Sequence, residues 1–97
     1  MNVVWAEAAV ADLVAIRLFI ADHNPQAASS VAARLLRAVD LLRDRPRLGF
    51  GTHVEDVRRL IVNQSPYSII YRIAGNDLQI IEIFDGRKFA PRTNIKG

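Results

Sequence analysis

Side chains that could cleave RNA are concentrated in the second half of this 97-residue chain. Cleavage through the 2′-hydroxyl needs a base, an acid and cations around the scissile phosphate. The candidate cations are Arg58, Arg59, Arg72, Arg87 and Lys88, the candidate acids are Tyr67 and Tyr71, and the candidate bases are Glu55, Glu82 and Asp85. These residue types would allow a metal-independent endoribonuclease if the fold brought one of each kind together.

The spacing of these candidates favours structural roles for several of them. Tyr67 and Tyr71 fall on the same face of a strand, together with apolar neighbours. Core packing with the hydroxyl at the rim therefore explains both tyrosines better than acid catalysis does. Arg58 and Arg59 are adjacent and point to opposite faces of a strand, so at most one of them faces a given partner.

Neither a metal site nor a cofactor site is predicted. His23 and His53 are thirty residues apart, and no acidic cluster has the spacing of metal ligands. His23 stands at the end of a predicted helix, where an interaction with the helix dipole is the simpler explanation. Gly49 and Gly51 lack the rest of a dinucleotide fingerprint. We therefore expect no bound metal and no cofactor.

Two β-prone runs, residues 66–73 and 78–88, flank a four-residue turn and predict a β-hairpin. Gly75 and Asn76 in this turn tolerate positive φ. Alternation places Tyr67, Ile69, Tyr71 and Ile73 on one face of the first strand, with Ser68, Ile70, Arg72 and Ala74 on the other. In the second strand, Leu78, Ile80 and Phe84, interrupted by Glu82, share one face, and Gln79, Ile81 and Ile83 share the other.

Neither face of this predicted hairpin is polar throughout. An antiparallel sheet with one wet face would alternate more cleanly between apolar and polar residues. Arg72 could pair with Glu82 across the hairpin, which would add little stability. The second face is therefore expected to be covered as well, either by more of this chain or by another protein.

The remaining elements follow from periodicity and from helix-ending residues. Residues 1–5 predict a short strand near a sheet edge, and residues 6–23 a helix. Asn24 and Pro25 end that helix and begin a second one, which runs to residue 44 and is stopped by Pro46. After a loop at 47–52, residues 57–62 predict a further strand.

The predicted order is therefore β-α-α-β-β-β, in one domain spanning residues 1–97. A helical hairpin at about 6–44 packs on an antiparallel sheet that contains a C-terminal meander at about 56–86, and a basic tail follows at 87–97. This is a two-layer α+β fold. Its four strands would leave one sheet face uncovered unless something binds there.

The charge of the chain is unevenly distributed. Residues 1–45 carry five basic and five acidic side chains, whereas residues 46–97 carry eight basic and five acidic ones, so the net charge of +3 lies in the second half. Such a surface suits an acidic partner, either protein or nucleic acid. There is no cysteine, no apolar run of about 18 residues and no signal-peptide pattern, so we expect a cytoplasmic protein without a membrane span.

The ordered set of these features resembles the RelE/ParE superfamily of toxins from type II toxin–antitoxin modules, and the ParE branch most closely. The resemblance covers nearly the whole chain. It rests on Trp5, Ala9, Asp12, Leu13, Asn24, Pro25, Ala27, Ala28, Pro46 and Gly49, and on the runs 57–62, 66–72 and 80–87. The Pro-Tyr, Tyr-Arg and Gly-Arg elements are the most similar to the ParE branch.

The resemblance implies a fold, a partner and two alternative targets. A cognate antitoxin, ParD-like or related, would neutralise the toxin by wrapping an acidic segment over its surface. The ParE branch is associated with plasmid stabilisation and with growth arrest through inhibition of DNA gyrase. The RelE branch cleaves mRNA in the ribosome. Asp85 stands where several RelE-branch nucleases carry a histidine. This departure from the RelE pattern makes the nuclease function the less favoured of the two alternatives.

The two alternatives assign different residues to the functional site. For binding to the antitoxin or the target, we expect Arg59, Arg72, Arg87, Lys88, Arg92, Ile70, Ile81 and Ile83. For the nuclease alternative, the candidates are Arg58, Arg72, Tyr71 and Arg87.

Overall fold

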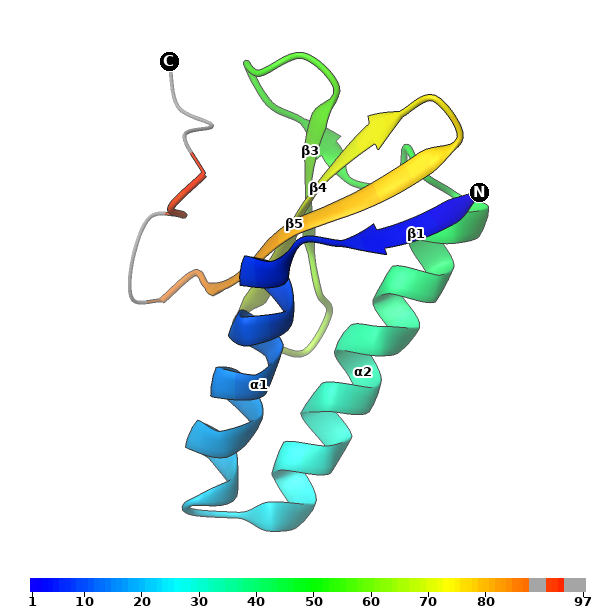
Figure 1. Cartoon of the computed structure of the whole chain (residues 1–97). Helices are drawn as coiled ribbons and strands as arrows, with labels where there is room; N and C mark the ends of the chain where they lie inside the picture. Colours follow the sequence, from blue (N-terminus) through cyan, green and yellow to red (C-terminus); the bar gives the residue numbers. More distant parts are fainter. Residues whose placement is uncertain (88–90, 94–97) are drawn as a thin grey trace.

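A computed structural model describes residues 1–87 and 91–93 of the chain. Its elements follow one another as β1 (Asn2–Trp5), α1 (Glu7–Ala21), α2 (Pro25–Asp44), β2 (Phe50–Gly51), β3 (Val57–Ile61), β4 (Tyr67–Ala74) and β5 (Asp77–Asp85). The two helices lie side by side as an antiparallel hairpin on one side of the sheet (Figure 1). The predicted two-layer α+β fold is confirmed. No helix in these residues is long and apolar enough to cross a membrane.

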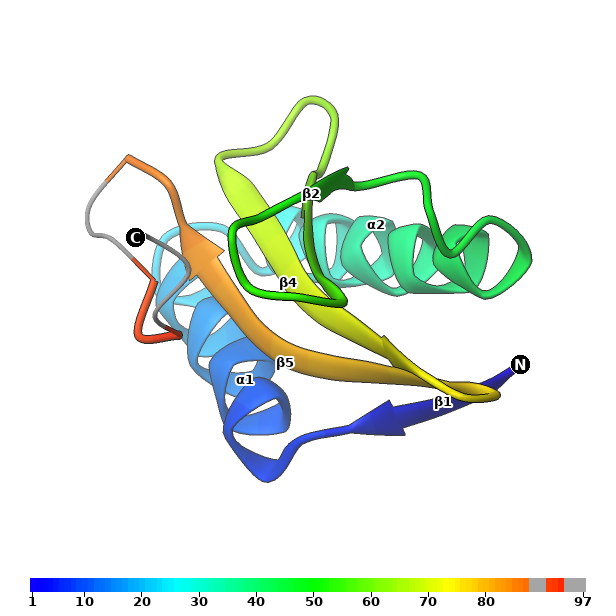
Figure 2. The same cartoon turned by 90° about the horizontal axis from the view of Figure 1, so that it is seen from above.

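The sheet has one strand more than predicted and is mixed in direction. Its order is β1-β5-β4-β3-β2, so β1 and β2 form the two edges (Figure 2). β1 runs parallel to β5, whereas the other neighbours are antiparallel. β2 lies in the segment predicted as a loop, because two residues are too short to show alternation. The direction of β1 depends on how the helical hairpin returns the chain to the sheet, which no local pattern encodes.

The helix boundaries follow the predicted end signals. Ala6 precedes α1 and provides no side-chain cap, because its methyl group cannot accept a hydrogen bond. The Asn24 side chain accepts a hydrogen bond from the Ala27 backbone N–H at 3.1 Å, and Pro25 occupies the first turn of α2. This cap satisfies one of the backbone donors that α2 leaves free. The sharp turn between the helices is therefore encoded by two adjacent residues.

A β-bulge in β5 changes which side chains face the helices. Tyr71 pairs with Ile80 and Ile70 pairs with Glu82, so Ile81 has no residue opposite it. One extra residue reverses the alternation beyond that point. Ile83 consequently joins the core, while Glu82 comes to lie beside Ile70 on the far face of the sheet. The prediction that Ile83 lies on the face opposite Ile80 is therefore wrong.

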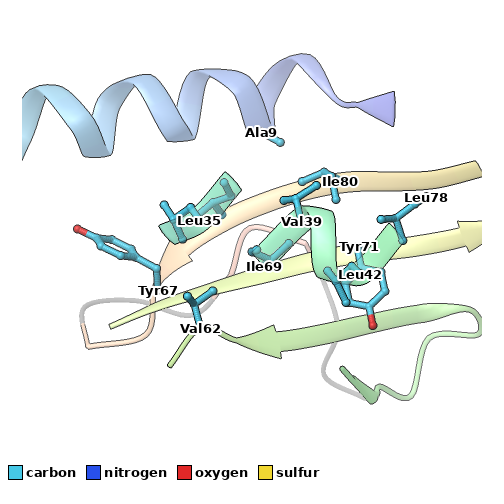
Figure 3. Packing of buried hydrophobic residues seen from close by; sticks show 11 residues of the cluster. Ala9, Leu35, Val39, Leu42, Val62, Tyr67, Ile69, Tyr71, Leu78 and Ile80 are labelled. Carbon is cyan, nitrogen blue, oxygen red and sulfur yellow. The ribbon is translucent and has the colours of Figure 1, made fainter. Parts of the chain in front are cut away.

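The core lies between the helical hairpin and the near face of the sheet (Figure 3). The helices contribute short and branched side chains, among which Ala9, Leu35 and Leu42 are fully buried. The strands contribute Tyr67, Ile69, Tyr71, Leu78, Ile80 and Ile83. Tyr71 and Leu42 both belong to this cluster, and each is 0% exposed. Both tyrosines thus take part in core packing, as the spacing predicted.

Candidate functional site

Arg59 on β3 is held between two aromatic rings on the far face of the sheet. Its guanidinium carbon lies 4.8 Å from the centroid of the Phe84 ring and 6.0 Å from that of Phe50. Its Nε donates a hydrogen bond to the Oγ of buried Ser68 at 3.2 Å. The rings and the hydroxyl fix the side chain across three strands. Arg59 therefore presents its charge from a defined position instead of sampling solvent.

Arg58, on the opposite face of β3, secures the connection between α2 and β2. Its Nη1 donates to the backbone carbonyls of Gly49 at 2.7 Å and Arg47 at 3.4 Å. The Tyr71 hydroxyl donates to the Pro46 carbonyl at 2.7 Å and accepts from the Gly49 N–H at 3.0 Å. Both polar groups are thus used to hold residues 46–49.

Burial raises the pKa of the Tyr71 hydroxyl, although the Gly49 N–H and the Arg58 charge counteract part of the shift. Burial and the negative charge of Asp85 raise the pKa of Tyr67 in the same way. A tyrosine with a raised pKa is a weaker acid, so these shifts do not prepare either hydroxyl for proton donation. The shifts bear instead on stability in alkaline solution.

We expect the free energy of unfolding to fall as the pH rises above about 10. The unfolded chain releases tyrosine protons near pH 10, whereas the folded chain holds those of Tyr67 and Tyr71 to higher pH. The stabilisation is therefore complete below pH 10 and is lost as the pH passes through the folded pKa, at up to about 1.4 kcal/mol per pH unit for each group.

Urea titrations between about pH 9 and 11.5 measure this slope, a window set by the tyrosine pKa. Tyr71→Phe and Tyr67→Phe should each flatten it, although each also lowers the starting stability. An unchanged slope in the double variant would assign the alkaline loss to other groups.

Arg87 just after β5 is paired with Asp85. Its Nε and Nη2 donate to the Asp85 carboxylate at 3.1 and 2.9 Å, and its backbone N–H adds a bond of 2.9 Å. Hydrogen bonding to Asp85 raises the pKa of Arg87 above the ordinary value of an arginine side chain. The Arg87 side chain is 65% exposed, so the pair stabilises the fold only slightly. Asp85 thus offsets the positive charge of Arg87.

Residues 91–93, here named the C-terminal strap, return to the end of β5 and to α1 (red in Figure 2). The Arg92 guanidinium bonds both carboxylate oxygens of Asp12 at 2.8 Å. Glu82, 2% exposed, accepts bonds from the backbone N–H groups of Arg92 and Thr93 and from the Thr93 hydroxyl. The strap therefore supplies the partners that a buried carboxylate on the far face requires.

The structure covers most of the surface that the sequence predicted to be open. Ile70 and Ile83 are buried, at 0% and 3% exposure, and Ile81 is half-buried. The expectation of an uncovered apolar face formed by these three residues is therefore wrong. The bulge turns Ile83 inward, towards the core. Lys88 lies outside the described residues.

Arg72 differs from the other predicted cations because its guanidinium has no bonding partner among the described residues. It is exposed and opposite Gln79, and the expected pair with Glu82 is not formed. Within residues 1–87 and 91–93, Arg72 has no ion pair or hydrogen bond from its guanidinium, in contrast to Arg58, Arg59, Arg87 and Arg92. Arg72 is thus the predicted site residue that remains available to a partner.

A second candidate surface, which no sequence pattern indicated, is a groove of about 610 Å³ between α2 and the outer edge of β3, here named the α2–β3 groove. Leu41, Leu48 and Ile61 line it and are 45%, 44% and 55% exposed. Leu41 on α2 cannot be distinguished from a core residue by periodicity alone. The groove becomes visible only when α2 and β3 are placed side by side.

A helical hairpin packed on one face of a sheet ordered β1-β5-β4-β3-β2 matches the fold of solved ParDE and RelBE proteins. Residues 3–88 match the model of the ParE toxin family of the type II toxin–antitoxin system parDE. The chain belongs to this family.

Similar proteins and structures agree with this assignment. Toxin RelE2 of Caulobacter vibrioides is 40% identical over 82 residues, which are 84% of this chain and 91% of that protein. Toxin Y4kP of Sinorhizobium fredii is 32% identical over 88 residues, 91% of either chain.

Among solved structures, the chromosomal ParDE system of P. aeruginosa superposes with a TM-score of 0.77 at 28% identity, covering 88% of this chain and 95% of that one. The E. coli RelBE complex superposes with a TM-score of 0.70 at 15% identity over 94% and 98% of the two chains, a likeness of fold. The chain is therefore the toxin component of a type II toxin–antitoxin system.

Proposed function

We propose that this toxin arrests growth by binding DNA gyrase and that it acts without cleaving RNA. The observation that carries the proposal is the occupation of the candidate catalytic groups. The Tyr71 hydroxyl and Arg58 hold residues 46–49, and Arg87 is paired with Asp85. A general acid and a cation committed to structural bonds are poorly placed for RNA cleavage. The match to the ParE family supports the same assignment.

The target surface in this proposal centres on Arg72 and the ring-held Arg59. Both belong to the far-face side of neighbouring strands, and Arg72 has no competing partner among the described residues. A fixed cation loses little conformational freedom when it meets an acidic partner. We therefore assign target contact to this pair, with the cytoplasm as the compartment in which it would occur.

Ribosome-dependent mRNA cleavage is the alternative. The observation that favours it is the relative named toxin RelE2, which is 40% identical over most of both chains. In this alternative, Arg72 and Arg87 would contact the scissile phosphate, and Arg87 would first have to leave Asp85. The two functions make opposite predictions for the same purified protein.

Two assays on the purified toxin separate the alternatives. For the gyrase function, we expect loss of supercoiling or accumulation of cleaved DNA, with translated mRNA left intact. Arg72→Ala should raise the toxin concentration for half-inhibition about tenfold, as expected for an interface anchor. Arg17→Ala, an exposed arginine on α1, is the matched control and should leave inhibition unchanged. Normal supercoiling at saturating toxin, together with codon-phased cuts in mRNA, would replace gyrase inhibition with the RelE-type function.

The antitoxin is the second partner in the proposal. It would be encoded by the reading frame next to the toxin gene and would be acidic enough to meet a toxin of net charge +3. Expression of the toxin alone should stop growth, and co-expression of the neighbouring frame should restore it. Unimpaired growth on expression of the toxin alone would contradict the proposed toxicity.

A further inference from the structure

The side of α1 that faces away from the core is apolar. Val10, Val14 and Leu18 are 46%, 51% and 63% exposed. The other exposed residues of this helix are Glu7, Ala8, Ala11, Ala15, Arg17 and Phe19. A helix that packs on a core with one side usually carries polar residues on the other, and a helix that is apolar all round is usually buried. α1 therefore has the composition of a helix that is covered on both sides.

The three large exposed side chains form a ridge next to a shallow groove. Val10, Val14 and Leu18 are four residues apart, and side chains at this spacing line up along a helix. The neighbouring line of residues at the same spacing contains Ala11 and Ala15, whose methyl groups leave a depression beside the ridge. In the commonest packing of two helices, a ridge of this kind enters such a groove. The exposed side of α1 thus carries both parts of one packing surface.

This surface is complementary to itself. Reversing the direction of the helix exchanges Val10 with Leu18 and leaves Val14 in place. A two-fold contact requires this property, because both subunits present the same surface. The exposed charges of the helix agree with such a contact. Glu7 lies at the N-terminal end and Arg17 towards the C-terminal end. An antiparallel pair of helices therefore brings opposite charges to each end of the contact, whereas a parallel pair would bring like charges together.

We propose that the toxin pairs with a second copy of itself through α1, in an antiparallel contact centred on Val14. Val10 then lies next to the partner's Leu18, and the ridge of each copy enters the groove of the other. One helix from each copy makes a small contact, so we expect a reversible dimer. The far face of the sheet, which carries Arg72, is on the side away from the helices and stays open (Figure 1). Self-association is therefore separate from the proposed binding of a target.

Cysteine cross-linking tests the arrangement, because the chain has no cysteine of its own. Two packed helices about 8–10 Å apart bring facing Cα atoms to about 4–5 Å, so Val14→Cys should form a disulfide-linked dimer under mild oxidation. Four residues span about 6 Å along a helix, so the two Val10 positions of an antiparallel dimer are about 12 Å apart, which is too far for a disulfide. Val10→Cys should therefore link to Leu18→Cys at least about tenfold faster than to itself.

Sedimentation equilibrium of the unmodified toxin, at about 1 to 200 μM, measures the association directly. Val14→Arg places two positive charges at the two-fold axis and should raise the dissociation constant of the dimer at least about tenfold. Ile61→Arg is the matched control. Ile61 is also β-branched and is 55% exposed, but it lies in the α2–β3 groove, which no residue of α1 lines. This substitution should change the dissociation constant less than about threefold.

The possible results each decide the proposal. A dimer that Val14→Arg weakens and Ile61→Arg does not, with the expected link between positions 10 and 18, would support it. A toxin that stays monomeric at the highest concentration and forms no cross-link would overturn it, and so would equal weakening by both arginine substitutions. Faster linking of Val10→Cys to itself would refute the antiparallel arrangement. If the amides of α1 were protected only after the product of the neighbouring reading frame was added, the surface would belong to the antitoxin instead of a second copy. The supercoiling and mRNA assays are independent of all these outcomes.

Discussion

Replacing Gly49 with alanine is expected to destabilise the toxin by about 2–4 kcal/mol. A Cβ at this buried position would lie 2.7 Å from the backbone oxygen of Arg59 and 2.7 Å from the Tyr71 hydroxyl. The strand oxygen cannot move without disturbing the sheet, so the loop must shift. The shift would break the bonds of Gly49 to Tyr71 and Arg58. Urea unfolding followed by circular dichroism measures the loss.

Gly51→Ala is the matched control for this prediction. Gly51 lies two residues further along the same segment, and a Cβ there would have nothing within 4 Å. We expect its free energy of unfolding to change by no more than about 0.5 kcal/mol. Equal effects of the two substitutions would show that close packing against β3 and Tyr71 is not what requires glycine at position 49.

Asp12→Ala is expected to cost about 2–3 kcal/mol, because it removes the acceptor of a β5 backbone donor. The Asp12 carboxylate accepts from the Ile83 N–H at 3.0 Å and also holds Arg92. Ile83 follows the bulge and lies beyond the pairs between β1 and β5, so its N–H has no strand partner on that side. Thermal unfolding with a urea titration measures the loss.

Two related substitutions separate the backbone bond from the ion pair. Asp12→Asn keeps an oxygen for the Ile83 N–H and loses the charge, and Arg92→Ala removes the ion pair alone. Each should cost less than about 1 kcal/mol, since the Arg92 side chain is 60% exposed. If Asp12→Asn cost as much as Asp12→Ala, the ion pair with the C-terminal strap would be the larger contribution.

Together these two predictions concern how the functional surfaces are held in place. Gly49 belongs to the connection that places β2 beside β3 and so defines where the open edge of β3 begins. Asp12 fixes the strap that supplies Glu82 with its hydrogen-bond partners. Weakening the first should alter the α2–β3 groove, and weakening the second should alter the far face. The two surfaces can therefore be perturbed independently.

Much of the fold could be predicted from the sequence because its signals are local. The Asn24 and Pro25 pair sets the start of α2, and Gly75 with Asn76 sets the turn between β4 and β5. Gly75 indeed adopts a positive φ of 59°. Each of these signals depends on a few adjacent residues and on backbone preferences. They were sufficient to predict the helical hairpin, the meander and the resemblance to the RelE/ParE superfamily.

The candidate site was less predictable because charge alone does not tell which cations are free. Arg58, Arg59, Arg72 and Arg87 are equivalent in a sequence, yet only Arg72 lacks a partner among the described residues. Arg59 is bound by residues nine and more positions away, and Arg58 by carbonyls of a loop. Which arginine meets a carboxylate, a ring or a carbonyl depends on packing between elements.

Signals within the sequence were enough to predict the class of protein, the two helices, the hairpin of β4 and β5 and the excess positive charge of the second half. The face on which Ile83 lies, the pairing of Arg92 with Asp12 eighty residues away and the α2–β3 groove could be seen only in the folded chain. These two groups of features differ in the range of the interactions that produce them. Backbone preferences act within a few residues, whereas a bulge in register, a buried carboxylate and a groove arise only when distant segments meet.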